Sequence, residues 1–189
     1  MNINSQVWRI VAVVGVSAAL VASIASCGSG DDETALNATP TTVAVSLDPC
    51  ASFTGQMTAA GYTAPDRRPD RTSPWPEQSC GFSHRDPRYA TGIAVMGKPY
   101  EAVIGEKSLV EREQLSLAGR DASVGDASAT TNLCMGSINI SPGTLQVRVG
   151  YTPRNEYTQP DALTTIDQAC AEVHKILDII TPVLPDRLD

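Results

Sequence analysis

Five cysteines divide the chain, and the first stands apart from the other four. Cys27 follows an apolar run near the N-terminus, whereas Cys50, Cys80, Cys134 and Cys170 are spread over the rest. An even set of cysteines in an exported chain indicates disulfides. Zinc sites usually show close ligand pairs such as C-x-x-C, and this sequence has none. We therefore expect two disulfides and no metal site, so that each bridge restricts how the chain can fold.

Residues 1–26 are typical of a bacterial lipoprotein signal peptide. Arg9 precedes an uncharged apolar run over residues 10–24, which is short for a stable span of about 20 residues. The run ends in Ile24-Ala25-Ser26-Cys27, with an aliphatic residue three before the cysteine and small residues between. This pattern is the lipobox. We expect cleavage before Cys27, diacylglycerol on its thiol, and a lipid anchor on the extracytoplasmic face of the cell membrane. An ordinary signal peptide and an uncleaved N-terminal helix are the alternatives.

A linker is expected between the anchor and the domain, over residues 27–46. Its sequence after Cys27 is small, polar and rich in threonine, and it begins with the acids Asp31, Asp32 and Glu33. Such a composition buries too little apolar surface to order itself. The acids lack the alternating ligands and turn glycine of a calcium loop. We expect a single globular domain over residues 47–189.

The overall composition argues against nucleic-acid binding. The chain has 14 basic and 21 acidic side chains, a net charge of −7 and two histidines. Nucleic-acid binding depends on lysine and arginine to displace phosphate counterions. Attachment to an anionic membrane surface is likewise expected to depend on the lipid rather than on the charge of the domain.

The first half of the domain reads as a helix, a loop and two strands. Asp48 can cap a helix with Pro49 in its first turn and Gly61 at its end. Residues 62–79 contain four prolines and are expected to form a long loop. Residues 80–84 and 90–97 are expected to be strands joined by a turn at Asp86-Pro87. A helix over residues 100–110, weakened by Gly105, and a strand with a turn at Gly119 follow.

The second half holds the strongest periodic signals. Leu133 to Ile140 and Thr144 to Tyr151 flank a Ser-Pro-Gly turn and predict a hairpin. One apolar stripe then repeats at alternating steps of three and four, over Leu163, Ile166, Cys170, Val173, Leu177 and Ile180. It predicts a long C-terminal helix that starts near residues 158–161 and packs on a sheet. Packing against another chain is the alternative.

These elements indicate an α+β fold. We expect an antiparallel sheet packed on one face by an N-terminal and a long C-terminal helix. Four cysteines allow three connectivities. We favour Cys50–Cys80 and Cys134–Cys170, because each pair joins a helix to a nearby strand in its own half.

The order of these features resembles a group of actinobacterial envelope lipoproteins that share domain of unknown function 3558. The likeness covers about residues 47–185. It rests on "LDPC" at the start of the domain, the Gly119-Arg120-Asp121-Ala122 turn and the cysteine order. Phe82 stands where such proteins often have an aromatic residue, two after the second cysteine. The resemblance implies a mycobacterial-type cell envelope and brings no reaction with it.

No catalytic motif is found. There is no G-x-S-x-G and no glycine loop of the kind that cradles phosphate. His84 follows Ser83 on an expected strand, where neighbours point to opposite faces, and we interpret it as a surface or turn residue. His174 is interpreted as a boundary residue of the last helix. Glu111 and Glu113, beside Arg112, are interpreted as a solvated face. We expect neither enzymatic activity nor a cofactor.

One stretch stands out as a candidate contact, "PDRRPDRTSPWP" at residues 65–76. Arg67, Arg68, Arg71 and Trp75 are of the types that proteins use to grip partners. Arginine binds phosphate and carboxylate groups in bidentate fashion. The alternative is a charged surface loop, partly neutralised by nearby acids. We therefore expect a lipid-anchored module that binds an envelope protein, lipid or glycan. An envelope hydrolase with an unrecognised site, and a structural or antigenic lipoprotein, are the alternatives.

Overall fold

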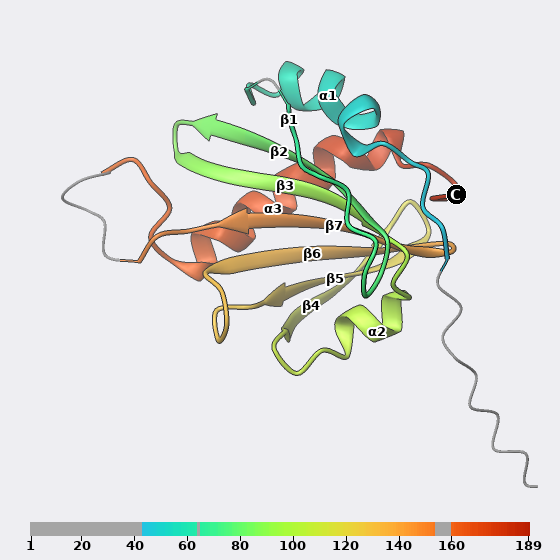
Figure 1. The fold of residues 1–189 in the computed structure, drawn as a ribbon. Helices are drawn as coiled ribbons and strands as arrows, with labels where there is room; N and C mark the ends of the chain where they lie inside the picture. Colours follow the sequence, from blue (N-terminus) through green and yellow to red (C-terminus); the bar gives the residue numbers. More distant parts are fainter. Residues whose placement is uncertain (1–42, 64, 154–159) are drawn as a thin grey trace, which may run out of the picture. The chain divides into compact units, whose positions relative to one another are not determined.

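Seven antiparallel strands form one sheet, in the order β1-β2-β3-β7-β6-β5-β4 (Figure 1). The computed structural model describes residues 43–63, 65–153 and 160–189. The expected signal peptide, Cys27 and most of the linker lie outside these residues. The strands are β1 (Asp66–Arg67), β2 (Glu77–Arg85), β3 (Arg88–Met96), β4 (Val110–Leu117), β5 (Arg120–Asp126), β6 (Leu133–Ile140) and β7 (Gly143–Gly150). The helices are α1 (Pro49–Ala59), α2 (Tyr100–Ile104) and α3 (Ile166–Ile180), followed by a 3-10 turn, Thr181–Val183.

Helices α1 and α3 pack on one face of the sheet, which we call the core face. Alternate residues of the strands point to this face and form the main apolar cluster with the two helices. Val173, Leu177 and Ile180 of the predicted stripe are among its buried members. The α+β class with an antiparallel sheet is thereby confirmed.

Helix α2 lies on the opposite face, which we call the open face, and this corrects the expectation that helices cover one face only. Val103 of α2 packs against Ala94 and Met96 in a second, small apolar cluster. These two strand residues alternate with Ile93 and Val95 of the core face. The helix also ends at Ile104, because Gly105 occupies its C-cap. Figure 1 shows α2 and α3 on different sides of the sheet.

Both favoured disulfides are confirmed. Cys50 of α1 is joined to Cys80 of β2, with 5.1 Å between Cα atoms. Cys134 of β6 is joined to Cys170 of α3, with 5.2 Å between Cα atoms. Each bridge therefore fixes one helix of the core face to the strand beneath it.

Other element boundaries also differ from the sequence prediction. Helix α3 starts at Ile166, because Thr165 and Gln168 form a capping box there, so Leu163 precedes the helix although it is buried. Strand β2 starts at Glu77, within the expected loop, and β1 pairs with it through Asp66 and Arg67. Short backbone pairing thus interrupts the proline-rich stretch.

Candidate functional site

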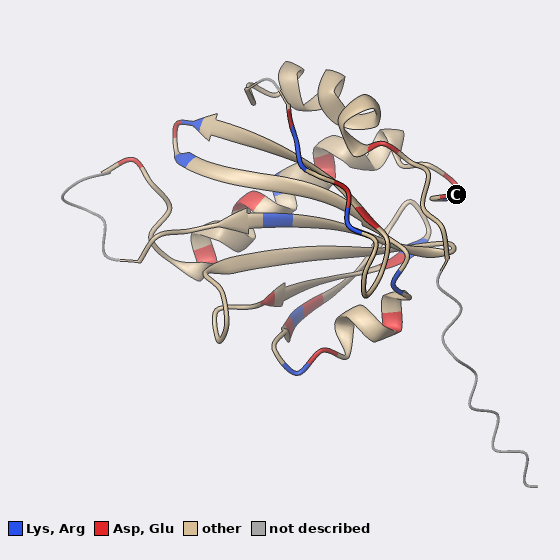
Figure 2. Cartoon of the chain, viewed as in Figure 1, with Lys and Arg blue, Asp and Glu red and all other residues tan. Residues whose placement is uncertain are grey.

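The arginine-rich stretch runs along the open face of the sheet. Its basic positions lie on β1 and on the connection to β2 (Figure 2). Arg68 stands over the sheet, since a Cβ built on Gly81 would lie 3.4 Å from its Nε. Arg71 Nη1 is 3.8 Å from Glu77 Oε2. Arg67 instead forms ion pairs with Asp48, the N-cap of α1, and with Asp70.

Two cavities on the open face meet at Arg148, a residue that the sequence prediction missed. The first has a volume of about 270 Å³ and is lined by Trp75, Met96, Val103 and Met135, among others. The second, also of about 270 Å³, lies over Gly81, Gly92 and Ala94. Arg148 lines both. We call the two cavities together the groove.

The cross-strand register explains why the groove exists. Gly81 of β2 faces Gly92 of β3, which faces Arg148 of β7, which faces Met135 of β6. Glycine inside a strand often marks the close approach of a ligand or of another segment. A Cβ on Gly92 would meet only the Cys80 carbonyl oxygen, at 3.8 Å. The space over Gly92 therefore lies between Arg68 on one side and Arg148 on the other.

Neighbouring side chains hold Arg148 in place. Its Nε donates a 2.6 Å hydrogen bond to Gln146 Oε1, and its Nη1 donates a 2.9 Å hydrogen bond to Glu77 Oε1. No acceptor for Nη2 occurs among the residues that the structure describes. The guanidinium is thus oriented before any ligand arrives, with donor capacity left over.

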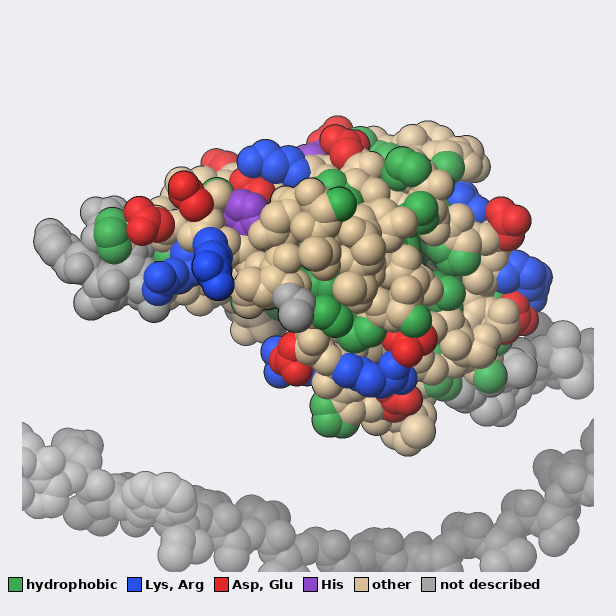
Figure 3. All heavy atoms as spheres, turned by 90° about the horizontal axis from the view of Figure 1, so that it is seen from above, with side chains coloured by type: hydrophobic (Ala, Val, Ile, Leu, Met, Phe, Trp, Pro, Cys, Tyr) green, Lys and Arg blue, Asp and Glu red, His purple; other side chains and the backbone are tan. Residues whose placement is uncertain are grey.

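The groove lining carries more positive than negative charge, in a chain whose net charge is −7. Its basic residues are Arg68, Arg71, Lys98 and Arg148, and its acids are Glu77 and Glu106. Lys98 pairs with Glu106, Arg148 with Glu77, and Arg68 with Asp66 outside the lining, at 3.2 Å. On the face of the molecule shown in Figure 3, by contrast, basic and acidic side chains lie beside one another. The groove is therefore suited to an anionic group.

Of the four predicted contact residues, three belong to the groove. Arg68 lines the glycine-floored cavity, and Arg71 and Trp75 line the other. Arg67 lines neither cavity. The sequence prediction missed Arg148, Met135 and Gly92, because their proximity to this stretch depends on the register of β3, β7 and β6.

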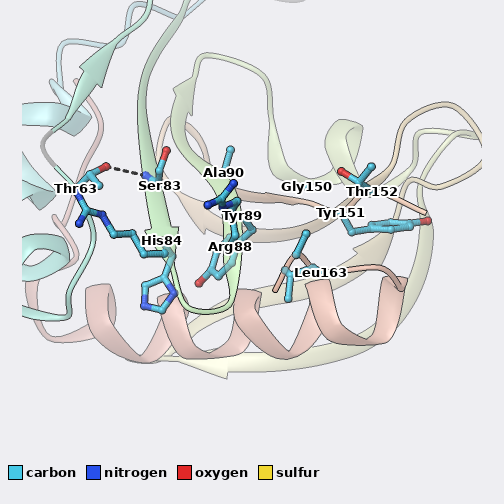
Figure 4. Close-up of a pocket in the computed structure, with 12 residues that line it drawn as sticks. Thr63, Ser83, His84, Arg88, Tyr89, Ala90, Gly150, Tyr151, Thr152 and Leu163 are labelled. Atoms are coloured by element: carbon cyan, nitrogen blue, oxygen red, sulfur yellow. Dashed lines mark hydrogen bonds between the residues drawn. The ribbon is translucent and has the colours of Figure 1, made fainter. Parts of the chain in front are cut away.

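A larger cavity, of about 490 Å³, adjoins the groove at Ala90 and Gly150. It lies at the turn between β2 and β3, and Ser83, His84, Tyr89 and Leu163 are among its lining residues (Figure 4). Ser83 and His84 point to opposite sides of β2. His84 Nδ1 lies 3.1 Å from the Pro87 carbonyl oxygen. Ser83 and His84 are therefore not arranged as a nucleophile and its base.

His84 is more than the surface or turn residue that we expected. Its ring is half-buried and lies 4.9 Å from the Tyr62 ring and 5.4 Å from the Tyr89 ring, between ring centres. Burial raises the pKa of Tyr62 and of Tyr89. Tyr89 also donates a 2.9 Å hydrogen bond to Glu172. This cluster ties β3 to α3 inside the core.

The remaining candidates lie on the edge strand β4, apart from His174, which lies on α3 and contacts that strand. His174 Nε2 is 3.1 Å from Glu113 Oε2, and both side chains are well exposed. Arg112 Nη2 is 2.6 Å from Asp167 Oδ1. A register shift falls between Glu111 and Glu113 of β4. Charge and a bulge on an edge strand hinder pairing with another chain, which accounts for Glu111, Arg112 and Glu113.

Comparison with family models, with curated proteins and with solved structures gave no match to this chain. The site must therefore be interpreted from its own residues. In the described part of the chain, no cluster of three or more metal-ligating side chains occurs. No described helix is long and apolar enough to cross a membrane.

Proposed function

We propose that this chain is a lipid-anchored lipoprotein on the extracytoplasmic face of the cell membrane, and that its domain binds a ligand in the groove. The observation that carries the proposal is the oriented guanidinium of Arg148. It stands on the central strand of the sheet, where two cavities meet. Ligand sites combine apolar lining with a few well-placed polar groups, and the groove has both.

The location rests on separate support. The lipobox at Ile24-Ala25-Ser26-Cys27 predicts the anchor. Two disulfides in a domain of this size are typical of oxidising compartments outside the cytoplasm. The resemblance to actinobacterial envelope lipoproteins points to the same place. Ser83 and His84 diverge in the cavity of about 490 Å³, which gives no support there to the hydrolase alternative.

In-cell photocrosslinking tests the binding role. We would place a photoreactive amino acid at Trp75, which lines the groove, and at Val110 as the control. Val110 is 60% exposed and lies on β4, at the edge of the sheet. An adduct of defined mass is expected from position 75 alone, and it should be lost in Arg148→Met. Identical adducts from both positions, or none from position 75, would leave the structural lipoprotein as the better description.

The anchor is tested separately. Cys27→Ser should lose the lipid mass and move the protein from the membrane fraction to the medium. Retention in the membrane with an unchanged mass would contradict the anchor without bearing on the groove.

A further inference from the structure

We infer that the ligand of the groove is an anionic amphiphile, with its charged group over Gly92 and its apolar limb in the cavity beside Trp75. The inference rests on the proposed binding role and names the chemical class of the ligand. Phosphate and carboxylate headgroups share the required chemistry, because arginine binds either of them bidentately.

The head position follows from the spacing of the strands. Neighbouring strands lie about 4.8 Å apart, so Gly81, Gly92 and Arg148 mark successive steps across the sheet. Arg68 covers Gly81, and Arg148 rises one strand beyond Gly92. An anion above Gly92 would therefore lie between two guanidinium groups. The absence of a Cβ there lets it approach the backbone closely.

The limb position follows from the walls of the neighbouring cavity. The apolar residues of its lining are Pro74, Trp75, Met96, Val103 and Met135, and the rest of the lining is charged or polar. Methionine adapts to irregular apolar shapes. A free inorganic anion would leave the apolar side of this cavity unused. An apolar limb covers that side while the head stays at Arg148.

The position of the groove in the sheet argues against the other ligand classes. Arg148 is on β7, which pairs with β3 on one side and β6 on the other. An extended peptide therefore finds no free strand edge there to pair with. Nucleic acid would need a long basic track, whereas the lining also carries Glu77 and Glu106.

Replacing Glu77 tests the inference, because the inference predicts in which direction the affinity changes. Its side chain is 12% exposed, and its two carboxylate oxygens face Arg148 and Arg71. It therefore occupies donors that an anionic head would use. Replacing it by glutamine removes the competing charge and keeps an acceptor for Arg148. We expect Glu77→Gln to bind an anionic amphiphile more tightly.

Trp75 provides the signal for a binding experiment. The chain has two tryptophans, Trp8 and Trp75. Trp8 lies in the expected signal peptide, so the mature lipoprotein keeps only the reporter inside the groove. The mature lipoprotein in phosphatidylcholine nanodiscs would be titrated with octyl phosphate, with octyl glucoside as the neutral amphiphile and with inorganic phosphate as the head alone. Empty nanodiscs correct for partition of the probes.

Octyl phosphate should give a saturable blue shift and bind at least about tenfold more tightly than either other probe, the scale of a charge-assisted hydrogen bond. Arg148→Met should weaken it by a similar factor, and Glu77→Gln should strengthen it. Arg187→Met is the matched control, because Arg187 is exposed and lines neither cavity. It should leave the affinity unchanged.

Three results would overturn the inference. If octyl glucoside binds as tightly as octyl phosphate and Arg148→Met has no effect, the ligand does not need an anionic head. If inorganic phosphate binds as tightly as octyl phosphate, the ligand does not need an apolar limb. No response to any probe, together with an adduct at position 75 in cells, would mean a ligand of another class. In that case the binding role would stand and only the amphiphile would fail.

Discussion

The hydroxyl of Tyr89 donates a 2.9 Å hydrogen bond to Oε2 of Glu172, joining strand β3 to helix α3 inside the protein. Glu172 is only 6% exposed. Its other oxygen accepts a 2.7 Å hydrogen bond from Lys175 Nζ, and the Tyr62 hydroxyl lies 2.6 Å from that of Tyr89. A buried carboxylate is tolerated only when such partners replace water. The four groups therefore act as one unit.

The first prediction is that Tyr89→Phe lowers the free energy of unfolding by about 1–3 kcal/mol, the cost of leaving a buried polar group unsatisfied. The change removes a partner from both Glu172 and Tyr62. Urea unfolding monitored by circular dichroism measures it. Tyr151→Phe is the control, because Tyr151 is half-buried and no described residue hydrogen-bonds its hydroxyl. Equal losses in the two variants would contradict a role for the network.

The same tyrosines predict how stability depends on alkaline pH. Burial raises the pKa of Tyr89 and of Tyr62 above the ordinary value of about 10. Above that pH the unfolded chain releases tyrosine protons that the folded protein keeps, so the folded state loses stability as pH rises. The slope is about 1.4 kcal/mol per pH unit for each such group.

Unfolding curves measured between about pH 8 and about pH 11 check this slope. The difference between the wild type and Tyr89→Phe isolates Tyr89 from lysines that titrate in the same range. Tyr89→Phe should give the shallower decline. Parallel declines would mean that Tyr89 ionises as readily in the folded protein as in the unfolded chain.

The third prediction concerns the contact between α3 and β6. A Cβ on Gly136 would lie 2.7 Å from Val173 Cγ1 and 3.1 Å from Leu177 Cδ1. Gly136→Ala should therefore destabilise the protein by about 1–3 kcal/mol through overpacking. Adding Val173→Ala should restore part of this loss, with a coupling above about 0.5 kcal/mol in a double-mutant cycle.

Gly55→Ala is the comparison variant, and it is expected to raise rather than lower the free energy of unfolding. Gly55 lies inside α1, and nothing within 4 Å would meet its Cβ. Alanine there should stabilise the protein by about 0.5–1 kcal/mol through helix propensity. For the Gly136 prediction, additive effects of Gly136→Ala and Val173→Ala would show that α3 does not pack against Gly136 through Val173.

Short sequence signals predicted the helix cap, the turns and the disulfides, because these depend on a few residues that lie close together. Asp48 accepts hydrogen bonds from the Cys50 and Ala51 amides, as expected of an N-cap. The Ser-Pro-Gly turn joins β6 to β7, and the turn at Gly119 joins β4 to β5. The favoured cysteine pairs were right because each tied a helix to a strand of its own half, and these neighbours do touch.

The start of α3 and the composition of the groove depended on strand register and on packing between elements. The stripe from Leu163 overstated α3, because a buried residue before a helix fits the same period as one inside it. The spacing of Thr165 and Gln168, a capping-box signal, marks the true start. Only part of the groove could be predicted from the sequence. Alternation in β7 places Arg148 away from the core, but only the pairing of β3 with β7 puts Gly92 beside it.

The fourth prediction is that Leu188 secures the C-terminal segment. It is fully buried, its amide donates a 3.0 Å hydrogen bond to the Ser141 carbonyl, and its own carbonyl accepts from Ser46 and Leu47. Leu188→Ala should cost about 2–5 kcal/mol, as for other buried leucines. Val183→Ala, at a side chain 36% exposed, should cost under about 0.5 kcal/mol. Similar costs would place the anchoring elsewhere in the segment.

The last prediction separates the two disulfides. Their cysteines are 30 and 36 residues apart, so loop closure alone gives nearly equal stabilisation, about 3–4 kcal/mol each. The two bridges differ in how their cysteines are packed. Cys134 and Cys170 are both buried, whereas Cys50 is only partly buried. Replacing Cys134 and Cys170 together by alanine should therefore cost more than replacing Cys50 and Cys80, because it also leaves space in the core between β6 and α3. Guanidinium unfolding of the two double variants measures the difference. Equal losses would mean that closure of the unfolded chain accounts for both bridges and that the sulfur atoms add no packing of their own.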